Sequence, residues 1–233
     1  MVVYLISSKE EKERQGHIQN LEKLFTGLNH IEAIYPSKIH IPFNNQIKEI
    51  TKKRTGNVLS NGSLGCLLSH RKIWSKIANE KKNEFYLILE SDSEIVSIDK
   101  INEFYDYVIN NYDLFFWGAF DGRMKLFYSK KIKMNNYNIG EPFIKSLYCT
   151  YGYMINKKAA KVLLEQTKHF DYPVDYWKIR LNNTTIKVGG ITPNLITTKV
   201  NFTSTISFVP KSFFHMVFNF IIDMKNIFIT LTK

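Results

Sequence analysis

The feature that most constrains this chain is a short apolar run that ends abruptly in acidic residues. Residues 85–89, Phe-Tyr-Leu-Ile-Leu, are too few for an isolated buried helix and too continuous for a strand with one wetted face. They therefore predict a central strand that is covered on both sides. Glu90, Asp92 and Glu94 follow directly and alternate with serines. Because ligands of open α/β sheets bind beyond the carboxyl ends of the strands, the acids stand where chemistry is expected.

The spacing of these acids suits a metal ion. Two carboxylates one residue apart on a loop, such as Glu90 and Asp92, offer oxygen ligands for a hard cation, Mn²⁺ or Mg²⁺. A cation held there can bridge the phosphates of a nucleotide. The alternative is a solvated acidic turn without a ligand, and the residues alone leave both interpretations open.

The charge of the chain favours an anionic partner. The 233 residues hold 32 Lys and Arg against 21 Asp and Glu, which gives a formal net charge of +11. Such an excess fits nucleic acid, a nucleotide or an anionic membrane surface. Residues 125–137 mix Lys and Tyr and predict a hairpin or flap, but no RNA-binding signature accompanies them, so no nucleic-acid partner is expected. Cys66 and Cys149 lack metal-binding spacing and are expected to be reduced core residues.

The order of apolar runs predicts an α/β fold with a mostly parallel central sheet flanked by helices. A strand over 2–6, which shows no features of a signal peptide, leads into a helix that starts at the serine pair 7–8. A second helix, with Ser63 as its N-cap, is expected to pack on the acid-terminated strand. Residues 36–61 show little periodicity and are interpreted as an irregular, mobile excursion.

The second half of the chain contains further acids beside expected strands. Strands are predicted at 114–117 and 153–155, and Asn156 is predicted to cap the helix that follows the second of them. Asp121 lies in the turn after the first. Residues 170–177 place two more carboxylates among aromatic side chains around a proline, an arrangement that can hold a sugar and accept a proton from its hydroxyl. A surface turn is the competing interpretation of that segment.

The end of the chain differs in kind from the rest. In residues 210–233 polar side chains recur every three or four positions and apolar ones fill the other faces, which predicts an amphipathic helix. Asp223 and Lys225 interrupt it, so a transmembrane span is not expected. Contact with a bilayer interface is favoured over docking on the domain. We therefore divide the chain into a domain over 1–209 and a C-terminal helix over 210–233.

Together, these motifs resemble bacterial glycosyltransferase family 25, the lipooligosaccharide galactosyltransferases and their relatives. The resemblance covers most of the chain. Each motif is short, but the order and spacing of all the motifs together argue against coincidence. The matching residues are Val3-Tyr4-Leu5-Ile6-Ser7, Glu13-Arg14, His17-Ile18, Ala33, Pro36-Ser37, Gly65-Cys66, Ser69-His70, Trp74, Glu90-Ser91-Asp92, Gly152-Tyr153-Met154-Ile155, Lys157-Lys158-Ala159 and Pro173-Val174-Asp175.

The resemblance implies a GT-A-like nucleotide-diphosphosugar transferase fold. It also implies an inverting transfer of a hexose, with galactose from UDP-galactose expected, onto a lipooligosaccharide or another bacterial surface glycan. UDP-glucose or a UDP-N-acetylhexosamine as donor, and a catalytically degenerate basic binding protein, are the alternatives. An enzyme of this kind is expected in the bacterial cytoplasm, peripheral to the anionic cytoplasmic face of the inner membrane, where a lipid-linked oligosaccharide acceptor is reached.

The same resemblance implies roles for individual residues. Asp92 holds Mn²⁺ or Mg²⁺ with help from Glu90, and Asp175 deprotonates the acceptor hydroxyl, with Asp121 and Asp171 as reserves. The implied donor-nucleotide contacts are Ser7, Arg14, Ser69, His70 and Glu90.

One residue departs from the family pattern. The family usually has Glu-Asp-Asp where this chain has Glu90-Ser91-Asp92. The outer two acids are kept, so the metal site is expected to persist, with a weaker grip on the metal or an altered choice of donor.

Overall fold

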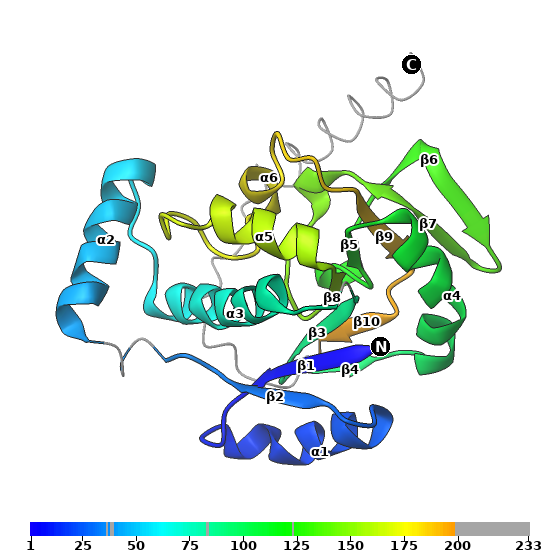
Figure 1. Cartoon of the computed structure of the whole chain (residues 1–233), viewed down its shortest axis with the longest axis horizontal. Helices are drawn as coiled ribbons and strands as arrows, with labels where there is room; N and C mark the ends of the chain where they lie inside the picture. The colour runs from blue at the N-terminus through cyan, green and yellow to red at the C-terminus, as the bar shows by residue number, and fades with distance from the viewer. Residues whose placement is uncertain (36, 38–39, 83, 123, 199–233) are drawn as a thin grey trace.

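The structure is a computed structural model, and it describes residues 1–198 except 36, 38–39, 83 and 123, with the side chain of residue 121 also left out. The predicted C-terminal helix, 210–233, lies outside the described residues. Figure 1 shows a central sheet with helices on both of its faces. The helices are η1 Lys12–Arg14, α1 Gln15–Leu24, α2 Ile41–Thr55, α3 Asn61–Asn79, α4 Ile98–Asn111, η3 Phe120–Gly122, η4 Ile144–Ser146, α5 Lys157–Gln166 and α6 Trp177–Arg180. The strands are β1 Val2–Ser7, β2 Asn29–Glu32, β3 Tyr86–Glu90, β4 Ser93–Ile95, β5 Leu114–Phe116, β6 Leu126–Met134, β7 Tyr137–Pro142, β8 Gly152–Ile155, β9 Val188–Thr192 and β10 Ile196–Thr198.

The main sheet is mixed rather than mostly parallel. Within the described residues it has eight strands in the order β2-β1-β3-β8-β5-β9-β7-β6. β1 pairs in parallel with β2 and β3, and β5 pairs in parallel with β9. The other neighbours are antiparallel, because β8 is inserted between β3 and β5 and because β6 and β7 form the predicted hairpin. The α/β class is thus confirmed, and the expected strand direction is only partly right.

The acid-terminated strand lies inside the sheet, as predicted. Tyr86 and Ile88 point to one face, where they join a core made with α3 and α5. Leu87 and Leu89 point to the other face, where they join a core made with α1 and α4. All four side chains are buried. A strand covered on both faces can be apolar along its whole length, which is the pattern that the sequence shows.

Three local predictions are corrected. The expected irregular excursion over 36–61 contains the helix α2, which starts with a proline in its first turn and ends at Gly56 in the left-handed conformation, with φ of 76°. The N-cap of α3 is Ser60 rather than Ser63, since the Ser60 side chain accepts a hydrogen bond from the Ser63 backbone N–H at 3.1 Å. β1 includes Ser7, and the α-helix that follows starts only at Gln15, after a 3₁₀ turn.

A second, two-stranded sheet closes over the edge where β3 ends. β10 pairs antiparallel with β4, so that Thr198 lies opposite Ser93 on the acidic loop. Ile196 of β10 packs so closely on the main sheet that a Cβ at Gly152 would meet its side chain at 2.5 Å. The end of the described chain therefore lies beside the acidic loop, residues 90–94.

Candidate active site

The acidic loop is fixed by hydrogen bonds on both of its sides. The Glu90 backbone N–H donates to Ser93 Oγ at 2.8 Å, and this hydroxyl donates in turn to the Tyr151 carbonyl. His17 of α1 contacts the Ser93 carbonyl oxygen through Nε2 at 2.7 Å. Because β8 runs antiparallel to β3, the residues that precede β8 reach the same edge of the sheet at which β3 ends. The loop is therefore held by two separate segments of the chain.

Glu90 is held by partners that favour its ionised form. Its Oε1 receives a hydrogen bond from Thr150 Oγ1 and lies 3.2 Å from His70 Nε2. Burial raises the pKa of this carboxyl group, but the hydrogen bonds from His70 and Thr150 outweigh burial and bring the pKa below its ordinary value. Glu90 is therefore a carboxylate fixed in one orientation.

A buried chain of hydrogen bonds orients the His70 ring and favours one tautomer of it. Trp74 Nε1–H can only donate, and it donates to the Tyr153 hydroxyl oxygen at 2.8 Å. The Tyr153 O–H is then available for His70 Nδ1, also at 2.8 Å. In this arrangement a neutral His70 carries its proton on Nε2 and donates it to Glu90. All three rings are fully buried.

This burial bears on the expected role of His70. Both ring nitrogens are engaged within the protein, and the side chain is 0% exposed. We therefore assign His70 to the positioning of Glu90. Direct contact of His70 with a nucleotide stays a prediction.

Asp92 is the acid of the loop whose ionised form is disfavoured by its surroundings. Its Oδ2 lies 3.5 Å from Arg14 Nη1, and the same guanidinium nitrogen donates to Ser91 Oγ at 2.7 Å. Its Oδ1 is buried and has no hydrogen-bond partner within the described residues. Burial and the negative charge of Glu90 raise the pKa of Asp92 to about 6, against the lowering effect of Arg14. A buried carboxylate oxygen without a partner fits a cation ligand.

Asp175 joins this acidic group from a distant part of the chain. Burial raises the pKa of its carboxyl group, and the negative charge of Glu90 raises it further. The segment is anchored by Trp177, which is fully buried and donates from Nε1 to the Cys149 carbonyl at 3.0 Å. We call Glu90, Asp92 and Asp175 the carboxylate cluster. The negative charge of Glu90 acts on both other acids, and their assignment to one functional site stays a prediction.

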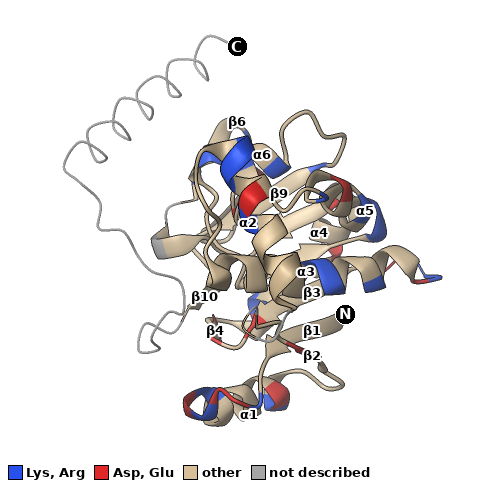
Figure 2. Ribbon diagram, turned by 90° about the vertical axis from the view of Figure 1, so that its left-hand side faces the viewer, with Lys and Arg blue, Asp and Glu red and all other residues tan. Residues whose placement is uncertain are grey.

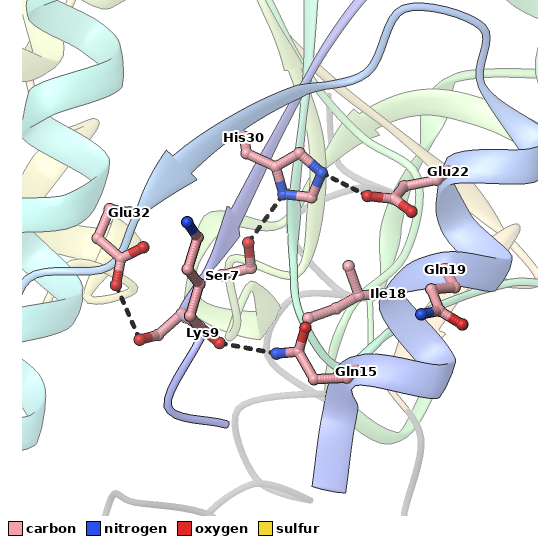
Figure 3. A pocket seen from close by; sticks show the side chains of 9 residues that line it. Ser7, Lys9, Gln15, Ile18, Gln19, Glu22, His30 and Glu32 are labelled. Atoms are coloured by element: carbon pink, nitrogen blue, oxygen red, sulfur yellow. Dashed lines mark hydrogen bonds and ion pairs between the residues drawn. The ribbon is translucent and has the colours of Figure 1, made fainter. Parts of the chain in front are cut away.

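A pocket of about 280 Å³ is lined by residues from the ends of β1 and β2 and from α1 (Figure 3). His30 forms part of its wall, with Nδ1 3.1 Å from Ser7 Oγ and Nε2 2.7 Å from Glu22 Oε1. Ser8 Oγ donates to Glu32 Oε1 at 2.8 Å. The turn from Ser8 to Arg14 joins this pocket to the carboxylate cluster, because it ends at the guanidinium beside Asp92. The lining residues are Ser7, Ser8, Lys9, Gln15, Ile18, Gln19, Glu22, His30 and Glu32.

Two further predicted residues serve the fold in this structure. Ser69 is buried, donates to the Gly65 carbonyl and accepts from the Ile34 backbone N–H, both at 2.8 Å, so it ties α3 to the segment after β2. Asp171 is buried and forms ion pairs with Arg54 and Arg180, each at 3.1 Å. These ion pairs give Asp171 a structural role, and its role as a reserve base stays a prediction.

The remaining reserve base, Asp121, lies in η3, and its side chain is outside the described part of the chain. Its role stays a prediction.

The sequence reasoning missed several residues that complete the site. Thr150 donates a hydrogen bond to Glu90, Tyr153 is hydrogen-bonded to His70, and Ser91 accepts a hydrogen bond from Arg14. Cys66, which was expected only as a core residue, lies one helical turn before His70 and close to Glu90. Burial, followed by the charges of Glu90 and Asp175, raises the pKa of its thiol well above the ordinary value. Its spacing to His70, four residues on one helix, was a signal that could have been noticed.

Comparison with known proteins identifies the family of this chain. The model of glycosyltransferase family 25, described as an LPS biosynthesis protein, matches residues 1–177. The chain belongs to this family. The matched region contains β1, α3, the acidic loop and Asp175, and therefore the whole carboxylate cluster.

A relative supports the assignment to glycosyltransferase family 25. A protein of Haemophilus influenzae, whose name provisionally assigns it to the glycosyltransferases, is 29% identical over 178 residues. The alignment covers 74% of this chain and 60% of that protein, so the chain spans less than two thirds of its relative's length.

One structural observation bears on membrane contact. Among the helices in the described part of the chain, none is both long enough and apolar enough to cross a bilayer.

Proposed function

We propose that this family 25 protein is an inverting hexosyltransferase that moves galactose from UDP-galactose to a lipooligosaccharide or another bacterial surface glycan. The observation that carries the proposal is the carboxylate cluster, in which one acid is fixed and ionised, one has an unpartnered oxygen and one has a raised pKa. A divalent cation needs carboxylate oxygens that are ionised or without another partner, and a general base needs a carboxylate that readily accepts a proton. UDP-glucose and UDP-N-acetylhexosamines remain alternative donors within the same proposal. A GT-A type of fold belongs to the proposal as well.

The residues present fit a divalent metal ion. Asp92 would hold it through the unpartnered Oδ1, and Glu90, whose orientation His70 and Thr150 fix, would supply a second oxygen. Mn²⁺ and Mg²⁺ both take carboxylate oxygens. When bound, such an ion offsets the negative charge of the departing diphosphate.

Asp175 is the proposed base. A carboxylate with a raised pKa is a better proton acceptor than an ordinary surface acid. In the proposed step the acceptor hydroxyl gives its proton to Asp175 while its oxygen bonds to the anomeric carbon of the sugar. The bond from that carbon to the diphosphate breaks, and UDP leaves with the electron pair. Attack from the side opposite the diphosphate inverts the anomeric centre.

The donor nucleotide is proposed to occupy the pocket at the ends of β1 and β2. Its polar lining can bond a base and a ribose, and Ser7, an expected nucleotide contact, forms part of the wall. A diphosphate that extends from this pocket along the turn 8–14 would meet Arg14 before it reaches Asp92. Arg14 is therefore proposed as a diphosphate contact.

The acceptor is proposed to be lipid-linked, with the protein peripheral to the anionic cytoplasmic face of the inner membrane. The net charge of +11 supports attraction to such a surface. In Figure 2 the ribbon is coloured for Lys and Arg at positions along α3, α5 and α6. The amphipathic pattern of residues 210–233 adds a second, apolar contribution.

Titration calorimetry tests the donor site directly. The protein is titrated with UDP, UDP-galactose, UDP-glucose and a UDP-N-acetylhexosamine, each with and without Mn²⁺. We expect metal-dependent binding that prefers UDP-galactose and that weakens in Asp92→Asn. Glu94→Gln, which changes an exposed acid on the same loop, is the matched control.

The outcomes separate the alternatives. Preference for another UDP-sugar would replace galactose and keep the reaction class. Absence of binding under all conditions would overturn the transferase proposal in favour of a degenerate basic binding protein, for which salt-sensitive binding of nucleic acid that ignores Mn²⁺ is the positive sign.

A further inference from the structure

We propose that Cys66, His70 and Glu90 form a binding site for Zn²⁺ that overlaps the proposed Mn²⁺ or Mg²⁺ site and excludes metal from it. The ligand atoms of these three side chains lie within 4.8 Å of one another. Thiolate and imidazole ligands favour a softer ion such as Zn²⁺. The two carboxylates of the acidic loop favour a hard ion such as Mg²⁺ or Mn²⁺.

The backbone brings the three ligands together in a fixed way. Cys66 and His70 stand four residues apart on α3, so their side chains lie on the same face of the helix. Glu90 approaches this face from the end of β3. None of the three is fully exposed, and His70 is completely buried. The site is thus a partly enclosed group rather than a scatter of surface residues.

The distances allow a zinc ion after a small adjustment. Zinc bonds are roughly 2.3 Å to sulfur and roughly 2.0–2.2 Å to nitrogen and oxygen, so two ligand atoms of one tetrahedral ion stand about 3.5 Å apart. Ligand atoms now separated by up to 4.8 Å must therefore approach by about 1 Å. Rotation of the Cys66 and Glu90 side chains can supply such a movement. Water can fill the fourth position, as in zinc sites with three protein ligands.

Zinc binding changes the protons of the site in a defined way. The Cys66 thiol loses its proton to solvent, and its sulfur electron pair forms the bond to the ion. His70 moves its single proton from Nε2 to Nδ1, so that Nε2 can bind zinc. Nδ1–H can then donate to the Tyr153 oxygen, and the Tyr153 O–H, which pointed at Nδ1 before, rotates away from it. A zinc-bound histidine commonly donates its second N–H in this way. Tyr153 is already 2.8 Å from Nδ1.

The shared residue is Glu90. The proposed donor-site cation needs the Glu90 carboxylate in the orientation that His70 fixes, and zinc removes both the carboxylate and the His70 hydrogen bond. The two metal ions are therefore expected to compete. The competition rests on the proposed function, whereas the zinc site itself does not.

Cobalt(II) is the probe for the site, because a Co²⁺–thiolate bond gives a charge-transfer absorption in the near ultraviolet that oxygen and nitrogen ligands do not. The full-length reduced protein is titrated with Co²⁺ and then with Zn²⁺. We expect one equivalent of Co²⁺ to produce the band and Zn²⁺ to abolish it. Cys66→Ser should lose the band and weaken Zn²⁺ binding by at least about a hundredfold, since even second-shell changes weaken metal sites by roughly ten- to a hundredfold.

Cys149→Ser is the matched control, because Cys149 is the other free cysteine and its Sγ faces the Gly118 carbonyl at 3.9 Å. It should keep the band. A band that persists in Cys66→Ser, or no band in the folded wild-type protein, would overturn the zinc site. A normal cobalt band together with no UDP-sugar binding would leave the zinc site intact and remove the proposed function instead.

Discussion

Replacing Asp92 by Asn is predicted to stabilise the fold at neutral pH while it removes the metal ligand. The pKa of Asp92 rises from an ordinary value of 3.8 to about 6 on folding, because the charged form is buried beside Glu90. A rise of about two units corresponds to about 3 kcal/mol of unfavourable free energy for the ionised group. The side chain is 23% exposed, so solvent reduces this cost and a gain of about 1–3 kcal/mol is expected from Asn.

The sign of the effect fixes its pH range. An acid whose pKa is raised by folding stabilises the native state only while it is protonated, and this contribution is lost as the pH rises through about 6. Asn resembles the protonated acid at every pH. The advantage of Asp92→Asn should therefore be greatest near pH 8 and should mostly disappear near pH 4, where Asp92 itself is protonated in the folded protein.

Urea denaturation of both proteins at the two pH values measures this difference. Glu94→Gln, an exposed neighbour on the same loop, provides the control and should change the free energy of unfolding by less than about 0.5 kcal/mol. A loss of stability in Asp92→Asn, or an equal gain at both pH values, would refute the assignment of Asp92 as a destabilised acid. The same variant should lose Mn²⁺-dependent turnover, so that stability and activity move in opposite directions.

Three further changes probe other parts of the site. Asp175→Asn should keep metal-dependent UDP binding and lower turnover by about a hundredfold or more, because it removes the proposed base. Tyr153→Phe should lower the free energy of unfolding by at least about 2 kcal/mol, since it leaves the buried Trp74 N–H and His70 Nδ1 without partners. Arg180→Met should cost about 3 kcal/mol, because it leaves the buried Asp171 with one guanidinium partner fewer.

Each of these has its control and its contrary result. Lost UDP affinity in Asp175→Asn, measured by calorimetry, would move that residue to the donor site. Tyr148→Phe, at a 49% exposed tyrosine, should leave stability within about 0.5 kcal/mol, and an equal loss there would deny the special role of Tyr153. Lys178→Met, at an exposed cation in the same short helix, is the comparison for Arg180 in urea denaturation, and similar losses in both would contradict the buried ion pair.

The parts of the fold that depend on local pattern were predictable. The run 85–89 predicted a strand covered on both faces, and Asn156 predicted a helix start. In the structure the Asn156 side chain accepts a hydrogen bond from the Ala159 backbone N–H at 2.9 Å. The helix α2 escaped notice because its apolar face is narrow, with only Ile47 and Thr51 buried. Pro42 in its first turn and Gly56 at its end were available signals.

The parts that depend on tertiary pairing were not predictable in this way. No local pattern tells that β8 enters antiparallel between β3 and β5 and so delivers Thr150 to Glu90. The hydrogen bond from Trp74 to Tyr153 likewise joins residues 79 positions apart. The assignment of Asp175 to the same site as Glu90 came from family resemblance, and in this fold the charge of Glu90 raises the pKa of the Asp175 carboxyl group.

The pairing of β10 with β4 sets a length scale for the rest of the chain. Thr198, opposite Ser93, lies at the acidic loop, and Pro210 follows twelve residues later. Twelve residues span at most about 40 Å when fully extended. If residues 210–233 hold the protein to a bilayer, they begin within that distance of Thr198. Residues 210–233 would then act as a membrane tether. The tether would keep the site close to sugars near the lipid and away from the far ends of long glycans.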